Sequence, residues 1–198
     1  MKVAVLAVQG AFAEHEAMLS KLGAECIQLR KKADLEQDFQ GLVLPGGEST
    51  VQGKLLKELE LFEPLKQRIQ DGMPVLATCA GLILLAEEIG NDSKRYFQTL
   101  PVRVRRNAYG RQLGSFHREA AFAGIGIVPM EFIRAPYVEE AFSGTEILAK
   151  VDEKIVAVRY QNQLGVAFHP ELCPDERIHR MFLNMVHSNS FRTDPHSL

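Results

Sequence analysis

The chain has 198 residues, of which 46% are hydrophobic, and its 23 Lys and Arg against 25 Asp and Glu give a formal charge of −2. This composition is typical of a globular protein and excludes a disordered or fibrous one. It also argues against nucleic acid as a partner, because phosphate binding needs a broad basic surface. The arginines Arg103, Arg105, Arg106 and Arg111 form only a small local cluster.

The sequence predicts a cytoplasmic protein without a membrane span. The longest nearly apolar run, residues 75–86, is shorter than the roughly 20 residues that cross a bilayer. The apolar stretch at residues 3–8 has no small-residue cleavage site, so we expect no signal peptide. Cys26, Cys79 and Cys173 are an odd number without a paired framework, which favours free thiols in a reducing compartment.

The first half of the chain alternates apolar, β-branched runs with helical patterns, which is typical of a parallel α/β fold. In chain order we expect a strand over residues 2–8, a helix over 12–22, strands over 26–29 and 41–44, a helix that begins near Ser49 or Thr50, a helix over 64–70, a strand over 75–78 and a helix over 80–89. Either Ser49 or Thr50 can cap its helix with the side-chain oxygen.

The second half changes to short alternating segments, which suggest antiparallel strands attached to the parallel sheet. These segments cover residues 101–106, 115–122, 131–133, 147–151 and 155–159. A last apolar strand over residues 164–168 and a closing helix over 175–187 follow. We expect a single domain over residues 1–187 and a polar, frayed tail over 188–198.

Thr78-Cys79-Ala80-Gly81 stands where a buried strand is expected to become a helix. Small residues around Cys79 allow a sharp turn beneath it, as in the nucleophile elbow of hydrolases but with sulfur in place of oxygen. The start of a helix stabilises an anion, so this position favours a reactive thiolate. The alternative is an ordinary buried cysteine, and nothing in the settings of Cys26 and Cys173 points beyond that.

A nucleophilic thiol needs a base and an orienting group, and His169-Pro170-Glu171 directly follows the last predicted strand. Positions i and i+2 of an extended segment face the same side, so Glu171 can hold the His169 imidazole in one tautomer. The alternative is a solvated turn at a strand end. The remaining histidines have no acidic partner at short spacing, and we expect them at the surface: His15, His117, His179, His187 and His196.

Pro45-Gly46-Gly47-Glu48 lies between a predicted strand and a predicted helix. Glycine lets backbone N–H groups turn toward an anion. Acyl transfer needs such donors, one from this loop and one from Ala80, to bind the oxyanion of the tetrahedral intermediate. A phosphate-binding loop is a competing interpretation, but the Lys and Ser/Thr of a P-loop are absent at their spacing. A plain turn is the other alternative.

The loop, the cysteine elbow and the His-Pro-Glu segment occur in an order compatible with one active site. With them, the sequence resembles the class I (triad) glutamine amidotransferases, and among these the glutaminase subunits of pyridoxal 5′-phosphate synthases. The resemblance covers residues 3 to about 186 and rests on residues 8–11, 44–50, 78–82, 106–107, 110–112, 132–136 and 168–172. It implies a flavodoxin-like three-layer α/β sandwich with a mostly parallel central sheet and an antiparallel extension.

The resemblance implies hydrolysis of L-glutamine to glutamate and ammonia, with no metal or organic cofactor. Cys79 is then the nucleophile, His169 the acid and base, and Glu171 the orienting group, while Gly47 and Ala80 supply the oxyanion-binding N–H groups. The implied contacts to glutamine are Gly46, Gly47, Glu48, Arg106, Ile133 and Arg134.

The resemblance also implies a partner, because the ammonia passes to a separate pyridoxal 5′-phosphate synthase core subunit. Gln9, Gly10 and Ala11 resemble a family segment at the contact with that subunit. The glycine pair is mobile enough for its oxyanion-binding amide to point away until the partner fixes it, so we expect the isolated chain to be a poor glutaminase.

Five positions depart from the closest family pattern. Ala77 stands where the family often has Gly, and Arg105 stands where an acidic residue is common. His117 replaces the usual Glu, and Tyr160-Gln161 replaces a typical Gln-Gly pair. None belongs to the triad, so they bear on fine contacts and partner fit rather than on the reaction. Two other classes of function stay open at this point. One is a stand-alone cysteine hydrolase of a related α/β superfamily, and the other is a non-catalytic regulatory module.

Overall fold

A computed structural model of the chain describes residues 1–107 and 114–193. Its parallel strands carry the site. They lie in the order β2-β1-β3-β4-β12, and each runs parallel to its neighbours in that order. Their bounds are β1 (Lys2–Leu6), β2 (Glu25–Leu29), β3 (Gly41–Leu44), β4 (Val75–Thr78) and β12 (Gln163–Val166). Every residue of β3, β4 and β12 is buried, as expected for parallel strands covered on both faces.

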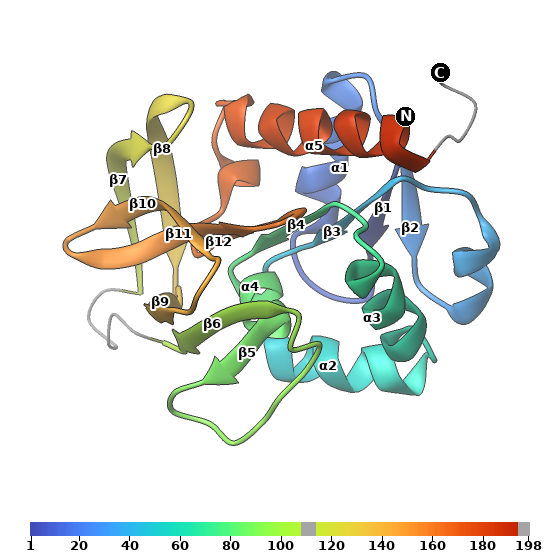
Figure 1. Cartoon of the computed structure of the whole chain (residues 1–198), viewed down its shortest axis with the longest axis horizontal. Helices are drawn as coiled ribbons and strands as arrows, with labels where there is room; N and C mark the ends of the chain where they lie inside the picture. The colour runs from blue at the N-terminus through green and yellow to red at the C-terminus, as the bar shows by residue number, and fades with distance from the viewer. Residues whose placement is uncertain (108–113, 194–198) are drawn as a thin grey trace.

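Helices cover both faces of these strands and complete the three layers that the resemblance implies (Figure 1). One face carries α1 (Phe12–Lys21) and α5 (Arg177–Thr193), and the other carries α2 (Ser49–Glu58), α3 (Phe62–Gln70) and α4 (Ala80–Leu85). Two short 3₁₀ helices, η1 (Lys32–Glu36) and η2 (Pro170–Leu172), follow β2 and β12.

An antiparallel extension continues the sheet beyond β12, through β11, β9 and β6. The edge strand β5 pairs in parallel with β6, and β10 pairs with β11. A separate hairpin joins β7 to β8. Bounds of these strands are β5 (Ala86–Ile89), β6 (Leu100–Arg105), β7 (Ser115–Phe122), β8 (Gly126–Ile133), β9 (Tyr137–Ala141), β10 (Glu146–Val151) and β11 (Lys154–Tyr160). The predicted α/β class with an antiparallel extension is therefore confirmed.

The predicted helix over residues 80–89 is wrong in its second half. α4 ends at Leu85, and residues 86–89 form β5, which pairs Ala86 with Leu100 and Ile89 with Val104 of β6. Residues 80–86 are all small or apolar, so the pattern there does not separate a buried helix from a buried strand. Residues 86–89 form a strand because they pair with β6, which the local sequence pattern does not reveal.

The ends of α2 and α5 also differ from the prediction. The N-cap of α2 is Glu48, without a side-chain cap, so neither Ser49 nor Thr50 caps that helix. The closing helix α5 begins at Arg177 and continues to Thr193, so the predicted frayed tail is wrong for residues 188–193. Residues 194–198 of the predicted tail, His196 included, lie outside the described residues. No helix in the described part of the chain is long and apolar enough to cross a membrane.

Candidate active site

The carboxyl ends of neighbouring parallel strands bring the predicted catalytic residues together. β4 pairs with β12 in a register that aligns Thr78 with Val166, so Cys79 and His169 follow adjacent strand ends. The loop after β3, residues 45–48 and hereafter the glycine loop, lies beside them because β3 pairs with β4 on its other side. This edge of an open α/β sheet is where such folds place their sites.

Cys79 occupies a sharp turn between β4 and α4. Its φ of 48° and ψ of −102° are a strained combination for a residue with a side chain, and such strain concentrates at functional sites. The turn needs Gly81, because a Cβ atom there would overlap the carbonyl oxygen of Leu44. Cys79 is 7% exposed, and its Sγ lies 3.9 Å from the carbonyl oxygen of Ile133. The geometry is that of the predicted elbow.

His169 and Glu171 form a buried pair beside Cys79. The Nδ1 atom of His169 lies 2.7 Å from Oε1 of Glu171, whose side chain is fully buried. Burial alone would lower the pKa of His169, but its contacts with Cys79 and Glu171 outweigh burial and raise the pKa to about 10. Burial would raise the pKa of Glu171, but His15 and His169 hold it below its usual value. The pair therefore favours a charged imidazolium next to the thiol.

Hydrogen bonds hold the glycine loop from two sides, from Thr78 and from residues 9–11. The N–H of Gly46 donates to Thr78 Oγ1 at 3.0 Å, and its carbonyl accepts from the N–H of Ala11 at 3.0 Å. The N–H of Glu48 donates to Gln9 Oε1 at 2.8 Å. The segment of residues 9–11, predicted as a partner contact, is thus bonded directly to the loop that carries the predicted oxyanion donor Gly47.

A cavity of about 530 Å³ opens over Cys79 and contains most of the predicted substrate contacts. Of the predicted residues, its lining includes Gln9, Gly47, Glu48, Cys79, Ala80, Arg106, Ile133, Arg134 and His169. Gly46 lies beneath the lining, against His169, and Glu171 lies behind that imidazole. The structure therefore brings the predicted triad, oxyanion donors and glutamine contacts to one place.

Charged groups of both signs line the cavity. Arg106 is held by Asp92, with 2.6 Å between Nη1 and Oδ2, and by the hydroxyl of Ser49. Arg134 Nη2 lies 3.5 Å from Glu48 Oε1, and both residues also line the cavity. Carboxylate and guanidinium groups on one wall can receive the ammonium and carboxylate groups of a zwitterion. Asp92 carries no sequence motif, and the sequence analysis does not find it.

Two histidines predicted at the surface are buried, so that prediction is wrong for them. His15 and His179 are 0% exposed, and His15 Nδ1 lies 2.9 Å from His179 Nε2. His15 Nε2 lies 3.1 Å from Thr78 Oγ1 and 3.3 Å from Glu171 Oε2. These partners are far apart in sequence, and no local spacing signals them. The predicted exposure of His117 and His187 is confirmed.

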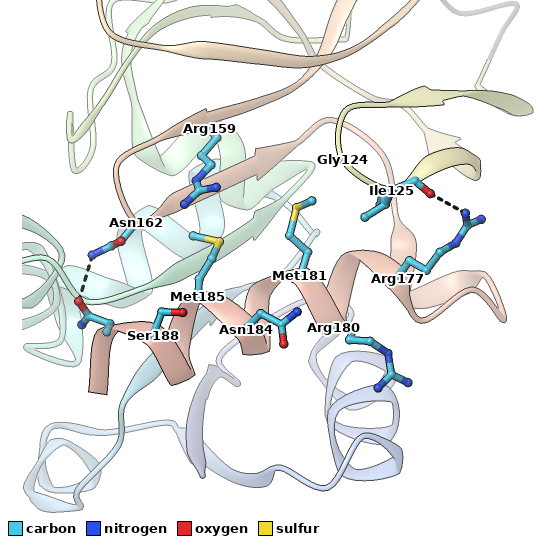
Figure 2. A pocket seen from close by; sticks show the side chains of 11 residues that line it. Gly124, Ile125, Arg159, Asn162, Arg177, Arg180, Met181, Asn184, Met185 and Ser188 are labelled. Atoms are coloured by element: carbon cyan, nitrogen blue, oxygen red, sulfur yellow. Dashed lines mark hydrogen bonds between the residues drawn. The ribbon is translucent and has the colours of Figure 1, made fainter. Parts of the chain in front are cut away.

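A second cavity, of about 460 Å³, lies between α5 and the antiparallel extension and contains none of the predicted site residues (Figure 2). All three of its arginines have partners, and Arg159 Nε donates to the carbonyl of Gln161 at 3.2 Å. Arg177 binds Asp175 and donates to the carbonyl of Ile125, and Arg180 binds Glu176. Within residues 1–107 and 114–193, no group of three or more His, Cys, Asp or Glu is arranged to hold a metal ion.

Positions that depart from the family pattern make ordinary contacts. His117 Nδ1 lies 2.6 Å from Glu131 Oε1, and Arg105 Nη1 lies 2.8 Å from Glu139 Oε1. Gln161 follows Tyr160 at the β11–β12 turn with a φ of 51°, a conformation that glycine adopts more easily. Ala77 is buried within β4. The motif residues Gly110, Arg111 and Gln112 lie outside the described residues.

The chain matches a family model described as the SNO glutamine amidotransferase family over residues 5–188. It is 66% identical over 186 residues to "Pyridoxal 5'-phosphate synthase subunit PdxT" of Desulfitobacterium hafniense (strain Y51), covering 94% of each chain. It is 49% identical over 193 residues to the protein of that name from Streptococcus pneumoniae (strain ATCC 700669 / Spain 23F-1), covering 96% of this chain and all of that one.

The fold is similar to a solved structure described as "Crystal structure of glutamine amidotransferase". The two superpose with a TM-score of 0.88 at 41% sequence identity, over 93% of this chain and 98% of the other.

Proposed function

This chain belongs to the SNO glutamine amidotransferase family, and we propose that it hydrolyses L-glutamine to glutamate and ammonia for a pyridoxal 5′-phosphate synthase. The observation that carries the proposal is the buried Cys79-His169-Glu171 arrangement at the floor of a cavity with charged walls. The names of the relatives, at 66% and 49% identity, supply the synthase. A stand-alone hydrolase or a non-catalytic module would leave these relationships without an explanation.

The first half of the reaction transfers the glutamyl group to sulfur. The Cys79 thiolate attacks the side-chain amide carbon, and the resulting oxyanion accepts hydrogen bonds from the N–H groups of Gly47 and Ala80. Ala80 is the first residue of α4, so its N–H has no acceptor within the helix. The His169 imidazolium gives its proton to the leaving nitrogen, and ammonia departs as a thioester forms.

The second half releases glutamate and restores the enzyme. His169 takes a proton from water as the water oxygen attacks the thioester, and the collapsing intermediate returns the thiolate to Cys79. Glu171 keeps Nδ1 of His169 protonated and fixes the direction of the ring, so that Nε2 carries both proton transfers. Neither half requires a metal or an organic cofactor.

Substrate recognition is assigned to the walls of the cavity. Glu48 receives the α-ammonium group of glutamine, while Arg106 and Arg134 receive its α-carboxylate. Ile133 and Gly46 limit the space around the side chain. Support for these roles comes from the Glu48–Arg134 contact and from the Asp92 and Ser49 contacts that hold Arg106 in place.

The same proposal includes control by the partner. Residues 9–11 contact the synthase core subunit, and their bonds to Gly46 and Glu48 transmit docking to the glycine loop. The Gly46 carbonyl belongs to the peptide group that carries the Gly47 N–H, so the Ala11 bond bears on where that N–H points. One oxyanion donor is worth ~10²-fold or more in rate, which is enough to make the lone chain nearly inactive.

Domain organisation and location complete the proposal. Residues 1–187, together with the rest of α5 to Thr193, act as one amidotransferase domain, supported by a single sheet whose strands run from residue 2 to residue 166. The cytoplasm is the proposed location, supported by the three free cysteines Cys26, Cys79 and Cys173.

The test is glutamate production from L-glutamine by the purified chain, with and without the pyridoxal 5′-phosphate synthase core subunit from the same source. We expect little activity from the lone chain and strong activity from the complex. Cys79→Ala, tested in the same complex, controls for contaminating glutaminases. Full activity of the lone chain, unchanged by the core subunit, would refute control by the partner. No activity in the complex would refute the glutaminase assignment.

A further inference from the structure

A buried polar chain continues from the triad into the helices α1 and α5. Glu171 uses Oε1 for His169, and its other oxygen, Oε2, lies 3.3 Å from His15 Nε2. Apart from this contact with His15, Oε2 has no polar partner in the described part of the chain. On the far side of His15, Nδ1 lies 2.9 Å from Nε2 of His179. All of these side chains are at most 8% exposed.

The same ring reaches the glycine loop through Thr78. His15 Nε2 lies 3.1 Å from Thr78 Oγ1, and that oxygen accepts the N–H of Gly46 at 3.0 Å. Gly46 immediately precedes Gly47, the proposed oxyanion donor. One nitrogen of His15 therefore faces both the carboxylate that orients the base and the hydroxyl that anchors the loop.

We propose that His15 is a positioning residue, which holds Glu171 through its second carboxylate oxygen and the Gly46 amide through Thr78. The inference deepens the proposed glutaminase function and rests on it. Because α1 begins at Phe12, directly after the residues assigned to partner docking, the same helix connects that segment to both parts of the catalytic machinery.

The hydrogen-bond chemistry fixes which ring nitrogen carries the proton. Burial lowers the pKa of His15, and burial together with His15 lowers the pKa of His179 to about 3, so both rings are neutral at neutral pH. A carboxylate accepts hydrogen bonds only, so the single N–H of His15 belongs on Nε2. His15 Nδ1 then accepts from His179 Nε2–H, which leaves the unpartnered His179 Nδ1 as an acceptor. The negative charge of Glu14, on the same helix, acts to raise the pKa of His15, but burial has the larger effect.

Two substitutions separate the two nitrogens of His15. In His15→Gln, the amide N–H₂ takes the place of Nε2 and can still donate to Glu171 and Thr78. In His15→Asn, the amide lies where Nδ1 was, so it keeps the contact with His179 and loses the donor toward Glu171. Both variants are polar and smaller than histidine, so they make similar demands on the surrounding core.

The experiment measures glutamate formation by each variant in the complex with the synthase core subunit. General acid–base catalysis contributes about 10²–10⁴-fold, so we expect His15→Asn to lower kcat about tenfold or more with KM for glutamine unchanged. We expect His15→Gln to stay within about threefold of the wild type. The rate is divided by the number of active sites that a diazoketone analogue of glutamine labels. A loss of folded protein is then not counted as a loss of kcat.

The pH profile gives a readout that a packing role would not move. Loss of a hydrogen-bond donor raises the pKa of a carboxylate, so the acidic limb of kcat for His15→Asn should move to higher pH, and that for His15→Gln should not. Thr78→Val tests the other connection and should lower kcat without moving that limb. If it leaves kcat unchanged, the connection through Thr78 is refuted.

The matched control is Gln163→Leu, which breaks the hydrogen bond of another buried polar side chain, to Thr99, at the amino end of β12. It should lower stability and leave kcat per labelled site and the pH profile unchanged. Equal effects of His15→Gln and His15→Asn on both kcat and the pH profile would overturn the inference. An inactive wild-type complex would instead refute the proposed function.

Discussion

Gly46 packs so closely against His169 that a Cβ atom on Gly46 would lie 2.9 Å from Nδ1 of the imidazole and would overlap Cε1. The same Cβ atom would lie 3.4 Å from Cβ of Cys79. Glycine at this position is therefore a requirement of the base, in addition to its place in the oxyanion loop.

Gly46→Ala should displace the His169 ring and separate it from Cys79. Misplacement of a reacting group by about 1 Å costs on the order of 10²-fold, so we expect at least that loss in kcat. The measurement is glutamate formation in the complex. Gly114→Ala is the control, because a Cβ atom there would meet nothing within 4 Å. Equal activity of the two variants would contradict the close packing.

Cys79→Ala should abolish ammonia release and leave the fold intact, because no other thiol is positioned to replace it. Burial raises the pKa of Cys173 to about 11 and also raises the pKa of Cys26, so both stay protonated at neutral pH. Cys26→Ala and Cys173→Ala should therefore keep activity. Mass mapping after labelling with a glutamine-analogue electrophile should find the label on Cys79 alone, and label on either other cysteine would argue against the triad.

His169→Asn should reduce kcat more than Glu171→Gln does. Removal of the base eliminates both proton transfers, which are worth about 10²–10⁴-fold, whereas removal of the orienting charge only weakens them. Rates for both variants are measured in the complex, with KM for glutamine as an internal check. Small and equal effects of the two substitutions would indicate that residues 169–171 form only a structural turn.

Stability should fall as pH rises from about 6.5 to about 10, because His169 has a pKa near 6.5 when unfolded and about 10 when folded. The folded state binds the proton more tightly across this range, so its contribution is complete below pH 6.5 and is lost as pH approaches 10. Urea unfolding midpoints at several pH values measure this slope. His169→Asn should show a flatter slope, and an unchanged slope would contradict the shifted pKa.

Arg106→Lys should raise KM for glutamine by about tenfold with little change in kcat, because lysine cannot keep the paired contacts of a guanidinium. Asp92→Asn should have the same effect at smaller size, since Asp92 holds Arg106 against the cavity at 2.6 Å. Initial rates over a range of glutamine concentrations separate the two constants. A fall in kcat with unchanged KM would contradict this role and would indicate that Arg106 acts in the chemical step rather than in glutamine binding.

Local patterns predict the parallel half of the fold well. Strands β3 and β4 match their predicted bounds, because short apolar runs that end in glycine or in a small-residue turn favour a buried strand over a helix. The positions of Cys79 and His169 are predictable for the same reason, because each directly follows an apolar run that forms a strand.

Features that depend on distant partners escape prediction. β9 contains Glu139 and Glu140, which look like a solvated segment, but they pair with Arg105 and Arg103 across the neighbouring strand β6. His15 looks like a surface residue of an amphipathic helix until Thr78 and Glu171 are brought against it. Both depend on contacts that only the completed sheet provides.

The position of β12 between β4 and β11 has a consequence for the newly made chain. Cys79 follows a strand in the first half of the sequence, whereas His169 and Glu171 follow the last strand to be synthesised. A chain that is still growing through the antiparallel extension has a thiol without its base. Glutamine hydrolysis therefore becomes possible only after β12 has been made and has closed the gap between β4 and β11.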